Sequence, residues 1–118
     1  MRPSVLMVDD HDVFRTRARA MLEAHGFDVI GEASDGRTAV AAADRLRPDI
    51  ALVDIGLPDI DGFAVAAMIR AAGTARRIVL ISGREAADYG GRMASSAADG
   101  FIPKGDLSGE SLHAMFGS

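Results

Sequence analysis

Residues 4–10, Ser-Val-Leu-Met-Val-Asp-Asp, hold the pattern that decides the fold. An uninterrupted apolar run with two β-branched residues comes directly before a pair of acidic residues. Such a run, without polar residues at alternate positions, is typical of a strand that is buried on both faces of a parallel sheet. The pattern returns at residues 49–54, Asp-Ile-Ala-Leu-Val-Asp, which also end in a carboxylate. We therefore predict two buried strands, Ser4–Val8 and Asp49–Asp54, with acidic residues at their carboxyl ends.

Helical and strand-like patterns alternate along the rest of the chain. Apolar runs predict strands at residues 27–30, 77–81 and 100–102, and helical spacing predicts helices at residues 12–25, 38–46, 63–72, 84–98 and 108–116. Turn residues such as Gly26, Pro48 and Gly73 mark helix ends, and Ser108 is the predicted cap of the last helix. Strands separated by helices imply right-handed crossovers and a parallel sheet that is covered on both faces. The predicted fold class is α/β, in one domain over residues 1–118.

The apolar positions also predict which helix faces are buried. We expect the core-facing residues to be Val13, Phe14, Ala18, Met21 and Leu22 in the first helix, and Phe63, Ala67 and Met68 in the third. The helix over residues 84–98 is the least stable of the five, because Gly90 and Gly91 each cost about 1 kcal/mol relative to alanine.

Composition excludes several classes of protein. The 118 residues are 48% hydrophobic and 25% charged, which favours one ordinary globular core over disorder. They contain no cysteine, which excludes disulfide scaffolds, thiolate metal sites and cysteine nucleophiles. Apolar runs as short as residues 5–8 and 63–69 cannot form a signal peptide or a membrane span. The net charge of −4 argues against a nucleic-acid surface. We therefore expect a cytoplasmic protein that binds neither nucleic acid nor membranes directly.

Polar residues follow the strands where each strand ends. Asp9 and Asp10 follow the first strand, Asp54 ends the third, Ser82 follows the fourth, and Lys104 follows the fifth. Ligands bind at this edge of an open parallel sheet. Any one of these aspartates could be a helix cap or a turn residue. Three carboxylates at one site repel one another, however, and a divalent ion such as Mg²⁺ relieves that repulsion.

With these residues in order, the chain resembles a bacterial response-regulator receiver domain of the CheY-like superfamily over essentially its whole length. The motifs that carry the resemblance are Val5-Leu-Met-Val-Asp-Asp-His11, Leu52-Val-Asp54, Leu57-Pro-x-x-Asp-Gly62, Ser82 after Ile-Val-Leu-Ile, and Gly100-Phe-Ile-Pro-Lys104. The resemblance implies a flavodoxin-like (βα)5 three-layer sandwich, with a parallel sheet in the strand order 2-1-3-4-5. The acidic pair and the ending at residues 100–104 look most like LuxR/NarL-type receivers. Those usually carry a DNA-binding domain, which we do not find in these 118 residues, so we expect a single-domain response regulator.

The resemblance also implies roles for individual residues. Asp54 would accept a phosphoryl group from a histidine of a sensor kinase. Mg²⁺ would be bound directly by Asp10, Asp54 and the carbonyl oxygen of Gly56, and through water by Asp9. Lys104, Ser82 and the backbone amide of Gly83 would contact the phosphoryl oxygens, and Phe101 would be the switch residue. The three histidines, including His11, show no metal-binding spacing, and we assign them no role.

Phosphorylation would change the surface formed by the fourth helix, the fifth strand and the fifth helix. That surface would bind a downstream protein, and a phosphorylation-dependent homodimer is compatible with the resemblance. We do not expect a true enzyme, because the chain would catalyse only its own phosphorylation and dephosphorylation.

Three alternatives stay open. A haloacid-dehalogenase-like phosphohydrolase would place a second aspartate where this chain has Gly56. A flavodoxin-like cofactor binder would need a phosphate-binding loop at the acidic residues 9–12. A receiver-shaped adaptor that is never phosphorylated would not need the full residue set. The chain also departs from the family, because Pro103 precedes Lys104 and Gly105 follows it, which excludes the usual Lys-Pro bond, and because Phe101 replaces a common tyrosine.

Overall fold

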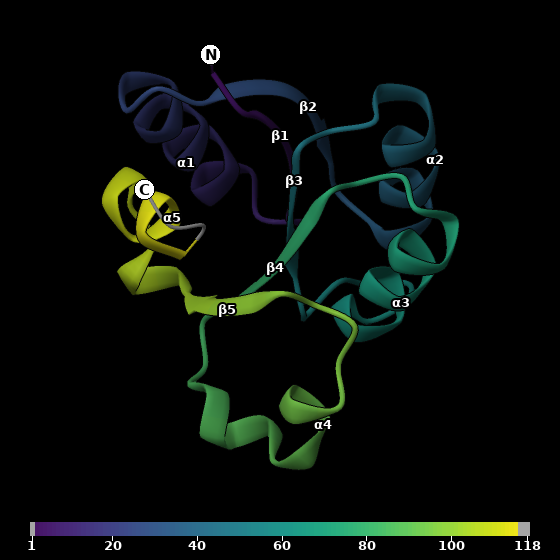
Figure 1. Ribbon diagram of the computed structural model, residues 1–118. Coiled ribbons are helices and arrows are strands. Elements are labelled where there is room, and N and C mark those ends of the chain that lie inside the picture. Colours follow the sequence, from purple (N-terminus) through teal and green to yellow (C-terminus); the bar gives the residue numbers. More distant parts are fainter. Residues whose placement is uncertain (1, 116–118) are drawn as a thin grey trace.

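The apolar runs that end in aspartates form the centre of a five-stranded parallel sheet in the order β2-β1-β3-β4-β5. The structure is a computed structural model that describes residues 2–115 (Figure 1). The strands are β1 (Ser4–Val8), β2 (Asp28–Ala33), β3 (Ile50–Asp54), β4 (Arg77–Ser82) and β5 (Gly100–Pro103). The helices are α1 (Asp12–Ala24), α2 (Gly36–Leu46), α3 (Gly62–Ala72), α4 (Gly91–Ala94) and α5 (Gly109–Met115), with 3₁₀-helices η1 (Ala86–Tyr89) and η2 (Lys104–Asp106). This is the predicted flavodoxin-like fold.

Side chains of each strand alternate between two cores. In β1, Leu6 and Val8 pack in the core under α2 and α3, whereas Val5 and Met7 pack in the core under α1 and α5. Figure 1 shows these helix pairs on opposite faces of the sheet. Because both faces are covered, the strands read as continuous apolar runs in the sequence.

The predicted caps and stops define most helix ends. The Asp35 carboxylate accepts a hydrogen bond from Thr38 N at 2.7 Å, so α2 begins two residues before the predicted start. Gly73 ends α3 with a φ of 66°, and Ser108 accepts a hydrogen bond from Ser111 N at 2.9 Å. Residue 116, the predicted last residue of the final helix, lies outside the described residues.

The second strand is longer than predicted. We expected it to end at Ile30, but β2 continues to Ala33, with Gly31 beside Leu6 in the neighbouring strand. A glycine often marks a strand end. Here it lies inside the sheet, where the Leu46 side chain of α2 packs so closely that an ideal Cβ would stand 2.5 Å from it.

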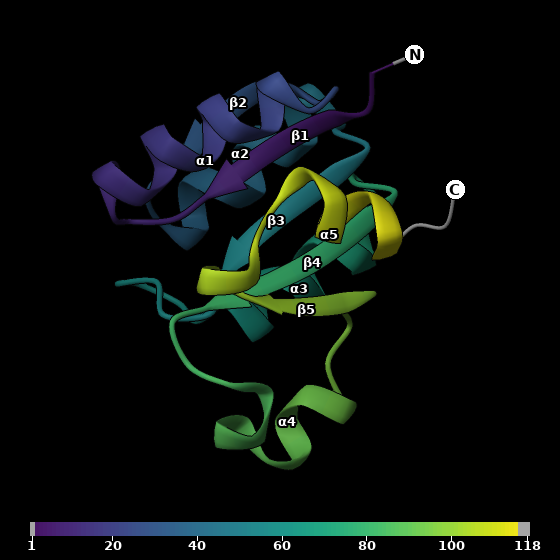
Figure 2. The same ribbon diagram turned by 90° about the vertical axis from the view of Figure 1, so that its left-hand side faces the viewer.

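The prediction of one helix over residues 84–98 is wrong in its extent. The segment contains only η1 and the single turn α4, which are separated at Gly90 (φ 56°, ψ −136°). That backbone conformation breaks an α-helix and is easily adopted by glycine. The segment lies beside β5, at the edge of the sheet (Figure 2).

Two predicted helix faces are corrected. Val13 is 68% exposed, so the buried side of α1 begins at Phe14. In α3, Ala67 and Met68 face solvent, and the buried residues are Gly62, Val65, Ala66 and Ile69. The reason is the close approach of Gly62 to β3, where an ideal Cβ would lie 2.4 Å from the Asp54 carbonyl oxygen. Within residues 2–115, no helix has the length and apolar character needed to cross a membrane.

Candidate functional site

The ends of β1 and β3 bring two aspartates side by side. Val8 pairs with Val53 in the parallel ladder, and the following residues are Asp9 and Asp54. Both carboxylates are buried, with relative exposures of 0% and 4%. Two buried carboxylates repel each other and need a nearby cation.

Lys104 supplies that positive charge in the structure. Its Nζ lies 2.7 Å from Asp9 Oδ2 and 3.3 Å from Asp54 Oδ2. The side chain reaches the site from the residue directly after β5, and its Nζ also stands 4.7 Å from the centre of the Phe14 ring. The aromatic face and the two carboxylates hold the ammonium at the carboxyl edge of the sheet.

The acidic cluster also offers oxygens to a divalent cation. Asp9 Oδ2 is buried, and no well-aligned hydrogen bond reaches it from residues 2–115, although Lys104 Nζ is close. One ligand atom from each of Asp9, Asp10, His11 and Asp54 lies within 4.8 Å of all the others. Carboxylate oxygens are the ligands that Mg²⁺ prefers. The residues present therefore fit a magnesium ion.

His11 belongs to this cluster, and the sequence analysis missed it. Its Nδ1 lies 3.1 Å from Asp9 Oδ1, 3.2 Å from Asp10 Oδ1 and 4.0 Å from Asp54 Oδ2. Its backbone N–H also donates to Asp9 Oδ1 at 2.8 Å. The available signal was its position directly after the acidic pair, at the carboxyl end of β1. The spacing between histidines could not indicate this position of His11, because the groups close to it in the fold are carboxylates and not other histidines.

Burial dominates the electrostatics of Asp54. Loss of solvent raises the pKa of the Asp54 carboxyl above its usual value, and the neighbouring Asp9 carboxylate raises it further. The backbone N–H of Gly56, at 3.2 Å from Oδ1, and the Lys104 ammonium act in the opposite direction without cancelling the effect. The ionised form of Asp54 is therefore held at a cost, which a bound cation would reduce.

The loops after β3 and β4 each contain a glycine near the end of the strand. Gly56 and Gly83 are both exposed. An ideal Cβ on Gly56 would meet only Asp54 Oδ1, at 4.0 Å, and one on Gly83 would meet nothing within 4 Å. These two positions therefore place no side chain against the carboxylate.

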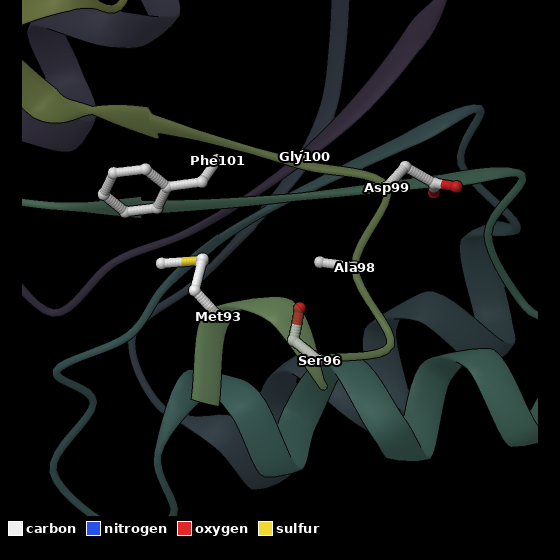
Figure 3. Close-up of a pocket in the computed structure, with 6 residues that line it drawn as sticks. All are labelled: Met93, Ser96, Ala98, Asp99, Gly100 and Phe101. Carbon is white, nitrogen blue, oxygen red and sulfur yellow. The ribbon is translucent and has the colours of Figure 1, made fainter. Parts of the chain in front are cut away.

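Ser82 ends β4 beside the site, but its hydroxyl does not bond the carboxylates. Its Oγ accepts a hydrogen bond from Arg84 N at 3.1 Å and shares a short hydrogen bond with the hydroxyl of Tyr89. Phe101, on β5, packs with the core under α2 and α3 and lines a cavity of about 160 Å³ together with Met93 (Figure 3). The structure thus gathers Asp9, Asp10, Asp54 and Lys104 into one cluster, with Ser82 and Phe101 in a neighbouring group around Tyr89.

Comparison with known proteins identifies the family of the chain. A family model described as "Response regulator receiver domain" matches residues 5–116. The chain is 35% identical over 104 residues to the "Virulence factors putative positive transcription regulator BvgA" of Bordetella pertussis, which covers 88% of this chain and 50% of that protein. A "Protein-glutamate methylesterase/protein-glutamine glutaminase" of Alkalilimnicola ehrlichii is 39% identical over 118 residues, covering 93% of this chain and 29% of that protein.

Among solved structures, the signal receiver domain of the putative response regulator NarL from Mycobacterium tuberculosis superimposes with a TM-score of 0.85. It is 29% identical in sequence, with 99% of this chain and 98% of that chain covered. The chain spans about half the length of curated relatives such as the regulator from Bordetella pertussis.

Proposed function

We propose that this chain, which belongs to the family of response regulator receiver domains, accepts a phosphoryl group on Asp54 in the presence of Mg²⁺. The observation that carries the proposal is a buried carboxylate, Asp54, which belongs to the acidic cluster and lies 3.3 Å from the Lys104 ammonium. Phosphoryl transfer asks a protein mainly to position the reacting groups and to neutralise charge, and this site has the groups for both.

The reaction forms one bond and breaks another. A carboxylate oxygen of Asp54 attacks the phosphorus of a phosphohistidine on a sensor kinase, the type of donor that phosphorylates receiver domains. A new O–P bond forms, and the P–N bond to the histidine breaks. The electron pair of that bond goes to the imidazole nitrogen, which then takes a proton from water.

The acidic cluster would hold the metal ion. Asp10, Asp54 and the carbonyl oxygen of Gly56 would bind Mg²⁺ directly, and Asp9 through water. When bound, Mg²⁺ supplies positive charge that reduces the repulsion between the carboxylates and the incoming phosphoryl oxygens. The raised pKa of Asp54 favours its protonated form. The positive charge of Mg²⁺ would counter this effect and favour the ionised carboxylate, which is the nucleophile.

Lys104, Ser82 and Gly83 would contact the phosphoryl oxygens. Lys104 Nζ is already 3.3 Å from Asp54 Oδ2, so a small movement would bring it to an oxygen of the new group. Ser82 would donate its hydroxyl hydrogen, and Gly83 its backbone N–H. The negative charge of the phosphoryl group would favour contacts between its oxygens and these donors. These contacts would replace those that Lys104 and Ser82 make in the unphosphorylated chain.

The output surface would be formed by α4, β5 and α5, with Phe101 as the switch residue. The η1–α4 segment has no buried residues, so its displacement exposes little core. We propose that a downstream protein, or a second copy of the chain, binds this surface after phosphorylation. The single-domain form of the regulator stays a prediction, and the mass of the native protein detected with an antibody against this domain would test it.

Two alternatives differ from this proposal in their products. A haloacid-dehalogenase-like phosphohydrolase would turn over many phosphate esters, but Gly56 stands where that family has its second aspartate. A receiver-like adaptor would bind partners without taking up phosphate. No observation favours either one.

The test is incubation with a small phosphodonor, such as acetyl phosphate, and Mg²⁺, followed by intact-mass spectrometry. We expect one phosphoryl group on the wild-type chain, and none on Asp54→Ala or when Mg²⁺ is chelated. Undiminished labelling of the variant would overturn the proposal. Multiple turnover on a phosphate ester would support the phosphohydrolase instead, and phosphotransfer from a panel of histidine kinases would identify the donor.

A further inference from the structure

We propose that Tyr89 is a positioning residue for phosphoryl binding, which holds the Ser82 hydroxyl in place and connects the site to β5. This inference rests on the proposed function, since it assumes that Ser82 meets a phosphoryl group on Asp54. Tyr89 lies at the end of η1, outside the acidic cluster, and is the single tyrosine of the chain.

The hydrogen bonds of Ser82 give Tyr89 its role. A serine hydroxyl can accept two hydrogen bonds and donate one. Ser82 Oγ accepts from Arg84 N at 3.1 Å, and its second partner is the Tyr89 hydroxyl. If Tyr89 donates, both acceptor sites of Ser82 are filled and the serine hydrogen is free to point elsewhere.

That free hydrogen is the group a phosphoryl oxygen needs. Ser82 ends β4 next to β3, with Ile81 paired to Asp54 in the ladder. A phosphoryl group on Asp54 would accept from Ser82, and Tyr89 would then be fixed as the donor to Ser82. Hydrogen bonds in such a chain strengthen one another, so Tyr89 would increase the affinity of Ser82 for the phosphoryl oxygen.

The ring of Tyr89 connects this chain of hydrogen bonds to the rest of the fold. It lies edge-on to Phe101 of β5, with 6.4 Å between ring centres, and edge-on to Phe63 of α3, at 5.6 Å. The cavity that Phe101 and Met93 line, between α4 and β5, gives the side chains of these two residues space to rearrange (Figure 3). Since Phe101 has no hydroxyl, the aromatic hydroxyl that hydrogen-bonds to Ser82 belongs to Tyr89 of η1 and not to a residue of β5.

Affinity for beryllium trifluoride, a phosphoryl analogue, measured by titration calorimetry with Mg²⁺ present, tests the positioning role. We expect Tyr89→Phe to weaken binding about three- to tenfold, the effect of one net hydrogen bond. Ser82→Ala should weaken binding at least as much, and adding Tyr89→Phe to it should change nothing further. Met68→Ala, which changes an exposed side chain of α3 outside the site, is the control and should bind as the wild type does.

Unchanged affinity of Tyr89→Phe, or equal losses for this substitution in the wild-type and Ser82→Ala backgrounds, would overturn the inference. Thermal unfolding of each variant shows that it is folded under the conditions of the titration. If the wild type itself binds no analogue and takes up no phosphoryl group, the proposed function fails as well. If the wild type binds and Tyr89→Phe binds equally, only the role of Tyr89 fails.

A second readout would not respond to a merely structural role. The chain contains no tryptophan and one tyrosine, so its intrinsic emission reports Tyr89 alone. We expect analogue binding to change that emission in the wild type. In Ser82→Ala, at saturating analogue, the change should be absent. An equal change in both proteins would contradict a hydrogen-bonded connection through Ser82.

Discussion

Lys104 Nζ lies 2.7 Å from Asp9 Oδ2, so the residue after the edge strand β5 neutralises the carboxylate that follows the inner strand β1. The same ammonium is 3.3 Å from Asp54 Oδ2. One lysine therefore contacts both carboxylates, and the other 12 of the 13 lysine and arginine residues are all arginine. A compact ammonium can approach both carboxylates as a point charge, whereas a guanidinium needs a wider, planar space.

The first prediction concerns this lysine. Lys104→Arg should retain the fold and the charge, and it should slow phosphorylation of Asp54 up to about a hundredfold, because the positive charge is displaced from its place. The rate of labelling by a small phosphodonor measures this effect. An unchanged rate would mean that any cation serves at this position.

Removal of the positive charge of Lys104 should lower the free energy of unfolding. Lys104→Ala leaves the buried Asp9 carboxylate without its cation, which should cost about 3 kcal/mol of unfolding free energy in metal-free buffer. Urea unfolding with a chelator present gives this value. Added Mg²⁺ should recover part of the loss. A variant as stable as the wild type without metal would show that Asp9 is neutralised in another way.

The second prediction follows from the raised pKa of Asp54. A carboxyl group with a higher pKa in the folded than in the unfolded state binds its proton more readily when folded, so its ionised form destabilises the protein at neutral pH. Metal-free Asp54→Asn should therefore be more stable than the wild type at pH 7. The difference should shrink as the pH falls through the folded pKa toward the usual aspartate value.

Saturating Mg²⁺ should reverse this order, because the ion stabilises the chain that binds it. Unfolding curves of both proteins, with Mg²⁺ and with a chelator, check the prediction. A wild type that is more stable than Asp54→Asn under both conditions would contradict it.

The third prediction concerns a carboxylate outside the site. Asp59 accepts hydrogen bonds from the backbone N–H groups of Gly36 at 2.7 Å and Arg37 at 3.0 Å, at the start of α2. These bonds, that of Gly36 first, lower the pKa of Asp59 to about 2. Its contribution to stability is complete above the usual aspartate pKa and is lost as the pH falls through about 2.

Asp59→Ala should accordingly be less stable than the wild type at neutral pH, and the two should converge as the pH falls from about 4 toward 2. Urea midpoints across this range measure the difference. Asp28→Ala, which removes an exposed carboxylate on β2 that forms no ion pair within residues 2–115, is the control. A constant difference down to pH 2 would show that the ionised Asp59 carboxylate is not the source of the lost stability.

The sequence predicted the sheet and the acidic cluster because both depend on short patterns. An apolar run specifies a buried strand, and parallel strands place their carboxyl ends at one edge, so Asp9, Asp54 and Lys104 follow from strand positions alone. The rotation of α3 did not follow from its composition. Val65 and Ile69 are buried instead of Met68, because Gly62 fits against the backbone of β3, a contact between elements that spacing along one helix does not contain.

The roles of His11 and Tyr89 also depend on contacts between different elements of the fold. The sequence around His11 predicts a loop residue, and only the fold brings its Nδ1 within 4.0 Å of three carboxylates. Tyr89 lies in a segment that we predict as one helix, but it contacts Ser82 from the 3₁₀-helix η1. Contacts between side chains on irregular backbone could not be derived from the periodicity of apolar residues.

The fourth prediction tests the packing behind the site. Gly62→Ala would place a methyl group 2.4 Å from the Asp54 carbonyl oxygen and 2.6 Å from Ile55 Cα, both in backbone that cannot rotate away. We expect a loss of about 2 kcal/mol in unfolding free energy, typical of an overpacked core. Gly91→Ala, with nothing within 4 Å of the new methyl group, should be as stable as the wild type or more so. Equal stability of both variants would contradict the close approach of α3 to β3.

The most direct test of the central claim is to locate the phosphoryl group on the chain. After treatment with phosphodonor and Mg²⁺, borohydride reduction converts an aspartyl phosphate to homoserine, which peptide mass spectrometry can place. We predict homoserine at Asp54 and at no other aspartate. Homoserine at Asp9 or Asp10, or a phosphoryl group on His11 with Asp54 unmodified, would contradict the account.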